Sequence, residues 1–143
     1  MSARTGKEFL HGLKDDRRIW VGSERVRDVA AHPAFAGAAR SVAAIFDLQH
    51  EAANVCLMPD PETGELINVS HLIPRSREDI ERRHACIERI AEFSVGIMGR
   101  TPDYLNVTVA GFAGRADEWA ANGNERGAAS LVAFQKEIAR RDL

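Results

Sequence analysis

Six consecutive residues, Gly99-Arg-Thr-Pro-Asp-Tyr104, combine residue types that could recognise an anion or a phenolate. Thr101 and Pro102 begin a helix directly after the preceding helix stops, so free backbone N–H groups lie at this junction. Arg100 adds a guanidinium beside them, and Tyr104, the single tyrosine of the chain, lies in the first turn of the new helix. The same residues also fit an ordinary corner between two helices, with Arg100 paired to a carboxylate and Tyr104 packed.

Other reactive residue types form weaker patterns. The sequence has no G-x-G-x-x-G, P-loop, G-x-S-x-G or H-E-x-x-H motif, which argues against the common phosphate-loop, serine-hydrolase and zincin classes. The 5 histidines have no second ligand at metal spacing, so no metal site is predicted. Cys56 and Cys86 are expected to be reduced, packed thiols. We interpret Asp103 as a charge that suits the helix dipole, and Trp20 and Trp119 as packing residues.

Composition predicts one soluble globular domain. The chain has 143 residues, of which 45% are hydrophobic, and 19 Lys+Arg against 21 Asp+Glu give a formal net charge of -2. This balance argues against nucleic acid or an anionic membrane surface as a partner, and arginine is spread along the sequence. No window approaches the roughly 20 apolar residues of a membrane helix, and the N-terminus is too polar for a signal peptide, which predicts a cytoplasmic protein.

Mainly helical elements must position these residues. Apolar periodicity and capping residues predict a helix beginning at Pro102 and others over residues 5–15, 33–50, 76–99, 116–121 and 128–141. Thr5 with Glu8 fits a capping box, and Ser76 fits an N-cap. Alternating runs around turn residues predict two small hairpins, at residues 19–27 and 54–70. Hairpins with strands this short are not stable alone, so they are expected to pack against helices.

The chain resembles the N-terminal region of the two-component, flavin-dependent aromatic hydroxylases, the family of the 4-hydroxyphenylacetate 3-monooxygenase oxygenase component. The matching segments are Arg4–Leu13, Val29–Phe35, Ala39–Val42, Ile73–Asp79 and Met98–Tyr104. The resemblance implies a mainly α fold: an orthogonal helical bundle with two small β-hairpins, as in the N-terminal domain of acyl-CoA-dehydrogenase-like flavoenzymes. It also implies that residues 1–143 are this domain of a larger monooxygenase whose middle β domain and C-terminal helical domain, with most flavin contacts and the oligomer interface, are absent.

For the complete enzyme, the resemblance implies ortho-hydroxylation of a phenol such as 4-hydroxyphenylacetate. The oxidant is a flavin C4a-hydroperoxide, formed from O2 and reduced FAD that a separate flavin reductase supplies. Arg100 and Tyr104 match the family's pocket residues, so Arg100 is expected to contact cofactor and phenolate, and Tyr104 to bond the substrate oxygen or relay its proton. A family histidine follows the segment matching Ala139–Leu143, so the chain alone is expected to be inactive. The full enzyme is expected to be a homo-oligomer.

Three alternatives follow from the same residues. A 4-hydroxybutyryl-CoA dehydratase of this fold family binds an iron–sulfur cluster through cysteines, but Arg100 and Tyr104 occupy the motif here, which favours the oxygenase branch. The chain also fits a non-catalytic, truncated remnant, or a helical module whose exposed apolar faces bind a partner chain. Finally, it fits a hydroxylase of the same family that acts on chlorophenols or other phenols.

Overall fold

The computed structural model describes residues 3–98 and 101–143, which form a helical domain with two antiparallel hairpins. The helices are α1 (Gly6–Gly12), α2 (Ala36–Glu51), α3 (Ala53–Cys56), α4 (Arg77–Ser94), α5 (Pro102–Ala113), α6 (Ala116–Ala120) and α7 (Glu125–Arg141), with 3₁₀ turns η1 (Val69–His71) and η2 (Ala121–Gly123). The strands are β1 (Ile19–Val21), β2 (Glu24–Val26), β3 (Leu57–Pro59) and β4 (Leu66–Asn68). The predicted mainly α fold with two small hairpins is therefore confirmed.

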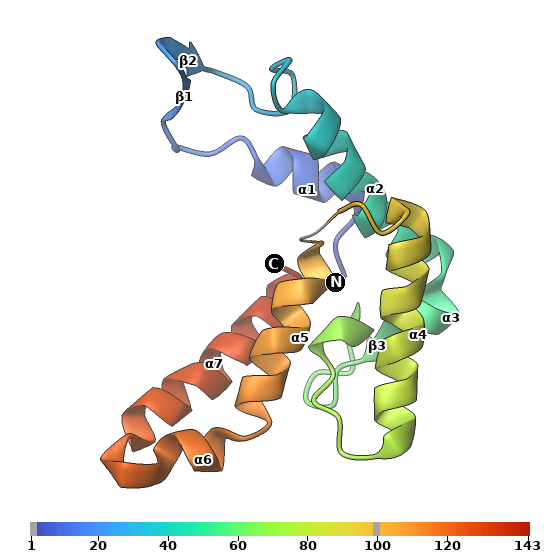
Figure 1. Cartoon of the computed structure of the whole chain (residues 1–143), viewed down its shortest axis with the longest axis vertical. Helices are drawn as coiled ribbons and strands as arrows, with labels where there is room; N and C mark the ends of the chain where they lie inside the picture. The colour runs from blue at the N-terminus through green and yellow to red at the C-terminus, as the bar shows by residue number, and fades with distance from the viewer. Residues whose placement is uncertain (1–2, 99–100) are drawn as a thin grey trace.

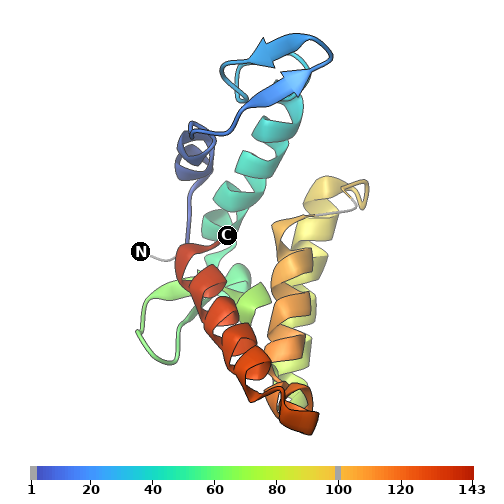
Figure 2. The same ribbon diagram turned by 90° about the vertical axis from the view of Figure 1, so that its left-hand side faces the viewer.

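Two helical arms meet where the segment before α1 contacts the end of α7, and α3, α4 and the β3–β4 hairpin lie outside both arms (Figure 1). One arm holds α1 beside α2, with the β1–β2 hairpin at its far end, and the other holds α5 beside α7, with α6 at its tip. A view turned by 90° keeps the segment before α1 close to the end of α7 (Figure 2). No helix in the described ranges is both long and apolar enough to cross a membrane.

The predicted capping box starts α1 and helps to place it against α2. The Glu8 N–H donates to Thr5 Oγ1 (3.2 Å), and the Thr5 N–H donates to Glu8 Oε2 (2.8 Å). Gly6 then donates its N–H to Asp47 Oδ1 (2.7 Å), and a Cβ at Gly6 would collide with the Ala43 carbonyl. Because only glycine permits this approach, α1 lies directly on α2.

The two hairpins differ in what surrounds them. In β3–β4, Met58 pairs with Ile67, and both are buried. In β1–β2, Trp20 pairs with Arg25, and Trp20 is 59% exposed. The interpretation of Trp20 as a packing residue is therefore wrong. Trp119 does pack edge-on against Phe112, with ring centroids 5.3 Å apart, but it remains half-exposed.

The core lies where α2, α4 and the β3–β4 hairpin converge. The elements that meet here all contribute buried side chains to it, which include Ile45, Leu48, Cys56, Met58, Ile67, Val69, Cys86, Ile90 and Ala139. Ala139 belongs to α7, so the last helix reaches the same core. Helices α2 and α4 supply four of these side chains, Ile45, Leu48, Cys86 and Ile90, and the other five come from α3, the β3–β4 hairpin, η1 and α7.

Several element boundaries differ from the prediction. Helix α4 ends at Ser94 rather than Gly99, because Val95 adopts a left-handed conformation and the Gly96 N–H donates back to the Ala91 carbonyl (2.9 Å). A left-handed residue followed by such a backward hydrogen bond is a common C-terminal cap, which ends the helix at this point. Residues 53–56 form the one-turn helix α3 instead of a strand, and α2 begins at Ala36 rather than Pro33.

Candidate functional site

Helix α5 begins where the sequence predicts. Thr101 is the N-cap residue and Pro102 follows at the first turn, but the Thr101 side chain makes no capping hydrogen bond. Arg100, predicted to bind cofactor and phenolate, lies outside the described residues, as does Gly99. Of the two predicted catalytic residues, Tyr104 is therefore the one that the described part of the chain positions.

Tyr104 lies on the outer face of α5, and its side chain is 53% exposed. Leu105 beside it is also exposed, and Phe112 continues the outer face two turns further on. The positions at helical spacing on the opposite face, Asp103, Asn106, Ala110 and Ala113, are buried. Tyr104 is therefore presented to solvent, and the alternative that it is packed in a helix corner is wrong for the described residues.

The inner face of the first turn of α5 carries buried polar groups. Asp103 lies in this turn, as expected, but its side chain is turned inward and is only 7% exposed. Asn106 Nδ2 donates to Ser70 Oγ (3.1 Å), which ties α5 to η1. Asp103 Oδ1 and Asn106 Oδ1 accept no hydrogen bond from the described residues. Both residues line an internal cavity of about 10 Å³.

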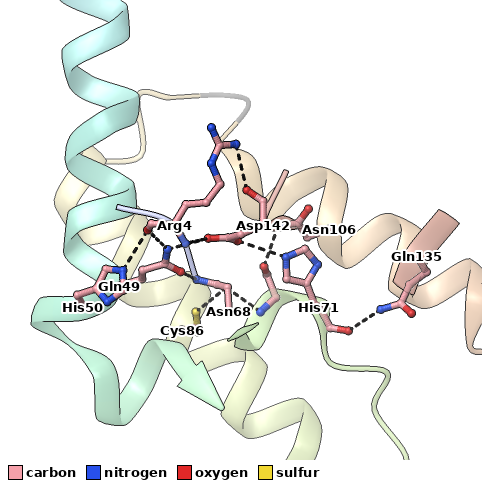
Figure 3. A network of polar contacts seen from close by, with 10 residues as sticks. Arg4, Gln49, His50, Asn68, His71, Cys86, Asn106, Gln135 and Asp142 are labelled. Atoms are coloured by element: carbon pink, nitrogen blue, oxygen red, sulfur yellow. Dashed lines mark hydrogen bonds and ion pairs between the residues drawn. The ribbon is translucent and has the colours of Figure 1, made fainter. Parts of the chain in front are cut away.

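Asp142 is the centre of a buried polar network that joins the two ends of the chain (Figure 3). Its Oδ2 accepts from the Arg4 N–H (2.8 Å) and from Gln49 Nε2 (2.8 Å). Its Oδ1 lies 3.4 Å from His71 Nε2, and both side chains are almost fully buried. One carboxylate therefore connects the N-terminal segment, α2, η1 and the end of α7.

The network extends through the amide side chains of Gln49, Asn68 and Gln135 to helices α4 and α7. Asn68 Nδ2 donates to Gln49 Oε1 (2.9 Å), and Cys86 Sγ donates to Asn68 Oδ1 (3.7 Å). Gln135 Nε2 of α7 donates to the His71 carbonyl (3.1 Å). These groups come from α2, β4, α4, η1 and α7, as Figure 3 shows. Since a buried polar group without a partner is costly, the network fixes one arrangement of these elements.

The sequence does not predict this network. His71 is one of the histidines for which no second metal ligand is found, and Asp142 enters only as part of the segment Ala139–Leu143 that precedes a family histidine. One signal was available: Gln49 and Asn68 are polar residues next to apolar ones in predicted elements, where a buried amide needs a partner. Which partner each would find depends on contacts between residues as far apart as Arg4 and Asp142.

The two cysteines are free and buried, as predicted. The interaction between the two thiols lowers the pKa of Cys56 and raises the pKa of Cys86, and burial raises the pKa of Cys86 further. Both side chains belong to the core. Within residues 3–98 and 101–143, no group of three or more His, Cys, Asp or Glu side chains could hold a metal ion.

Comparison with known proteins gives consistent matches. A family model described as 4-hydroxyphenylacetate 3-hydroxylase N terminal matches residues 5–143. The oxygenase component of 4-hydroxyphenylacetate 3-monooxygenase from Thermus thermophilus is 40% identical over 116 residues, which cover 80% of this chain and 24% of that protein. A crystal structure of such an oxygenase component, complexed with FAD and 4-hydroxyphenylacetate, has a TM-score of 0.87 and 35% identity over 99% of this chain and 29% of that one.

A more distant likeness concerns the fold alone. An archaeal 4-hydroxybutyryl-CoA dehydratase from N. maritimus has a TM-score of 0.74 at 17% identity, over 99% of this chain and 28% of that one. Together these likenesses confirm the expected acyl-CoA-dehydrogenase-like N-terminal fold. The chain spans about a quarter of the length of the proteins it matches.

Proposed function

The chain belongs to the 4-hydroxyphenylacetate 3-hydroxylase N-terminal family, and on that premise we propose that it is the N-terminal domain of an aromatic monooxygenase that uses reduced FAD. Residues 1–143 form this domain, and a middle β domain and a C-terminal helical domain complete the enzyme. The observation that carries the proposal is the exposed phenol of Tyr104 on a helix whose opposite face is buried and is anchored by the hydrogen bond from Asn106 to Ser70.

The substrate we propose is a phenol, with 4-hydroxyphenylacetate as the first choice, and the reaction is hydroxylation ortho to its hydroxyl group. A phenolate is a stronger ring nucleophile than a neutral phenol. The guanidinium of Arg100 stabilises the phenolate because it is always charged and presents several N–H donors. The Tyr104 hydroxyl donates a hydrogen bond to the substrate oxygen or takes part in moving its proton.

Reduced FAD, when bound, supplies the activation of O2, and a separate flavin reductase supplies the reduced cofactor. The residues of this chain provide part of a binding site for the flavin. The phenol ring of Tyr104 and the side chain of Leu105 give an exposed aromatic and apolar wall against which a planar ring system can pack. Arg100 is the residue of this chain that we assign to the cofactor. The other walls belong to the remaining domains, so the chain alone is inactive, and the complete enzyme is a homo-oligomer.

A chimeric enzyme tests this proposal. The chain is joined to the downstream region of the Thermus thermophilus oxygenase component and supplied with a flavin reductase, FAD, NADH and O2. We expect hydroxylation of 4-hydroxyphenylacetate, measured as catechol product per NADH consumed, with 4-chlorophenol and 4-nitrophenol assayed in parallel to rank substrates. Arg100→Ala and Tyr104→Phe should each lower the rate by about 10²- to 10³-fold.

Matched controls separate these roles from general damage. Arg126→Ala removes another exposed arginine, and Phe134→Ala truncates an exposed apolar side chain on α7, outside the proposed cofactor wall. Both should keep most of the activity. If Arg100→Ala retains the full rate and full coupling of NADH to product, the role assigned to Arg100 is wrong.

A second candidate function is a module that binds a partner chain without catalysis. Large apolar side chains are exposed on several helices and their ends, among them Ile80, Val95, Ile97, Phe112 and Phe134. Such faces mark contact surfaces when they are contiguous. Light scattering and an FAD titration of the 143-residue chain separate the two functions. Self-association without flavin binding favours the module, whereas stoichiometric FAD binding rules it out.

A further inference from the structure

The β1–β2 hairpin and the residues next to it carry three arginines, Arg18, Arg25 and Arg27. Trp20 pairs with Arg25 across the two strands, while Ile19 pairs with Val26. Side chains alternate between the two faces of a strand, so the paired residues Trp20 and Arg25 share one face. Arg18 and Arg27 flank the strands, one residue before β1 and one after β2, and line the same hollow as Arg25. All four are exposed, whereas Val26 on the other face is buried. We call Arg18, Trp20, Arg25 and Arg27 the hairpin face.

The arginines of the hairpin face have no carboxylate partner, although acidic groups lie nearby. Three of those groups have other partners: Asp15 lies 2.7 Å from Arg17, Asp28 lies 3.9 Å from Lys14, and Glu24 lies 3.5 Å from His32 Nε2. A fourth, Asp16, forms no ion pair among the described residues. In the part of the chain that the structure describes, Arg18, Arg25 and Arg27 form no ion pair or hydrogen bond through their guanidinium groups. Three guanidinium groups are therefore free to bind an anion. They border an open hollow of about 680 Å³.

Trp20 adds an apolar side chain to this charged face. It is the most exposed aromatic side chain described, at 59%, and it lies opposite Arg25 across the two strands. Tryptophan and arginine are the residue types that contribute most to protein–protein binding, and a tryptophan left in water gains by being covered. The hairpin also lies at the far end of the α1–α2 arm, away from α5 and α7 (Figures 1 and 2). A partner can therefore reach it from outside.

We propose that the hairpin face is a docking surface for an extended, acidic segment of a partner protein. Arg25 is the middle residue of β2, and Arg27 directly follows Val26, the last residue of that strand. Two residues of extended backbone span about 7 Å. An extended peptide with carboxylates at alternate positions has the same spacing, so each carboxylate meets one guanidinium in a bidentate pair. Trp20 packs against the intervening side chains or backbone. The proposal does not depend on the hydroxylase function.

Charge favours an acidic protein segment over nucleic acid. The hollow beside the arginines is also lined by Asp15 and Asp16, and Asp16 has no ion pair among the described residues. A nucleic acid carries a dense and continuous row of phosphates that would meet these carboxylates. A peptide can place its acidic groups against Arg25 and Arg27 alone. The net charge of -2 for the whole chain adds to the repulsion of a polyanion.

Fluorescence anisotropy on the 143-residue chain tests the proposal. The probe is a fluorescein-labelled peptide of alternating glutamate and serine, and the matched peptide has glutamine in place of glutamate. We expect saturable binding of the glutamate peptide alone, weakened by salt. In a Trp119→Phe background, Trp20 is the remaining tryptophan, and its fluorescence should change on binding.

Charge-matched variants locate the site. Arg25→Glu/Arg27→Glu should weaken binding by about tenfold or more, and Trp20→Ala by about fivefold. Lys7→Glu/Arg126→Glu changes the net charge equally at two exposed positions elsewhere and should leave binding unchanged. Circular dichroism checks that each variant is folded. Absence of binding, or equal loss in both double variants, overturns the proposal. Tighter binding of a fluorescein-labelled single-stranded DNA overturns it in favour of nucleic acid.

Discussion

The Asp142 network and the outer face of α5 differ in burial and in the part that each plays in the domain. The network is buried, and it joins segments from both ends of the chain through fully enclosed polar groups. The outer face of α5 carries Tyr104 and Leu105, which the fold leaves exposed. The contrast shows that the residues that hold this domain together are distinct from Tyr104, to which we assign a catalytic role.

Helix α5 connects the two regions. Its inner face is fixed by the bond from Asn106 to Ser70, and Ser70 lies in η1 beside His71 of the network. Its rotation about its own axis is therefore set by buried polar contacts, and Tyr104 must point away from them. A residue positioned by a rigid helix is held more precisely than one on a loop. Changes to the network and to the outer face should consequently have very different effects on stability.

The largest expected effect comes from Asp142→Ala. This change removes the carboxylate that accepts from the Arg4 N–H and Gln49 Nε2 and that contacts His71 Nε2. These three groups then lose their contact with Asp142 inside the domain. We expect the free energy of unfolding to fall by about 3–5 kcal/mol, measured by urea denaturation. Asp142→Asn keeps one acceptor oxygen and should cost less. A loss below about 1 kcal/mol for Asp142→Ala would show that the network does not hold the ends of the chain together.

Next in size is Gly6→Ala, which tests the contact between α1 and α2. A Cβ here meets the Ala43 carbonyl and lies 2.6 Å from Asp47 Oδ2, so the helices must move apart. We expect a loss of about 1–3 kcal/mol. Gly37→Ala is the matched control: it lies in α2 with open space around it and should stabilise by about 0.5 kcal/mol. Equal effects at the two positions would mean that α1 does not pack closely on α2.

Tyr104→Ala should change stability by less than about 0.5 kcal/mol, because its side chain is exposed and makes no buried contact that the fold requires. Thermal unfolding followed by circular dichroism measures this. A loss of several degrees in Tm would place Tyr104 among the residues that hold the fold and would remove the contrast between the two faces of α5.

The smallest effect is the pH dependence contributed by Glu8. Hydrogen bonds from the Thr5 backbone and side chain hold the pKa of Glu8 below its ordinary value of 4.5. Because the folded state favours the carboxylate, Glu8 stabilises the fold above this value and stops doing so as the pH falls through the lowered pKa. Between about pH 5 and pH 2, Tm should fall more steeply for the natural chain than for Glu8→Gln. Parallel curves would show that the capping box contributes no pH dependence.

Local signals in the sequence determined much of the fold. The capping residues Thr5 and Ser76 start α1 and α4 where predicted, because a cap depends on neighbours within one turn. The Pro102 signal likewise placed the start of α5, and alternation around a glycine turn placed β1 and β2. The five matching segments, with the motif at 98–104 among them, indicated the family, which the family model confirms.

Only the tertiary structure decided which polar residues meet. Arg4, Gln49, Asn68, His71 and Asp142 come from separate segments, and no local pattern links a histidine in η1 to an aspartate at the end of α7. The same holds for exposure: Trp20 and Tyr104 are aromatic residues in regular elements, and only the packing of other elements decides that neither is covered. Sequence determines short-range backbone preferences, whereas burial and long-range pairing depend on how the elements assemble.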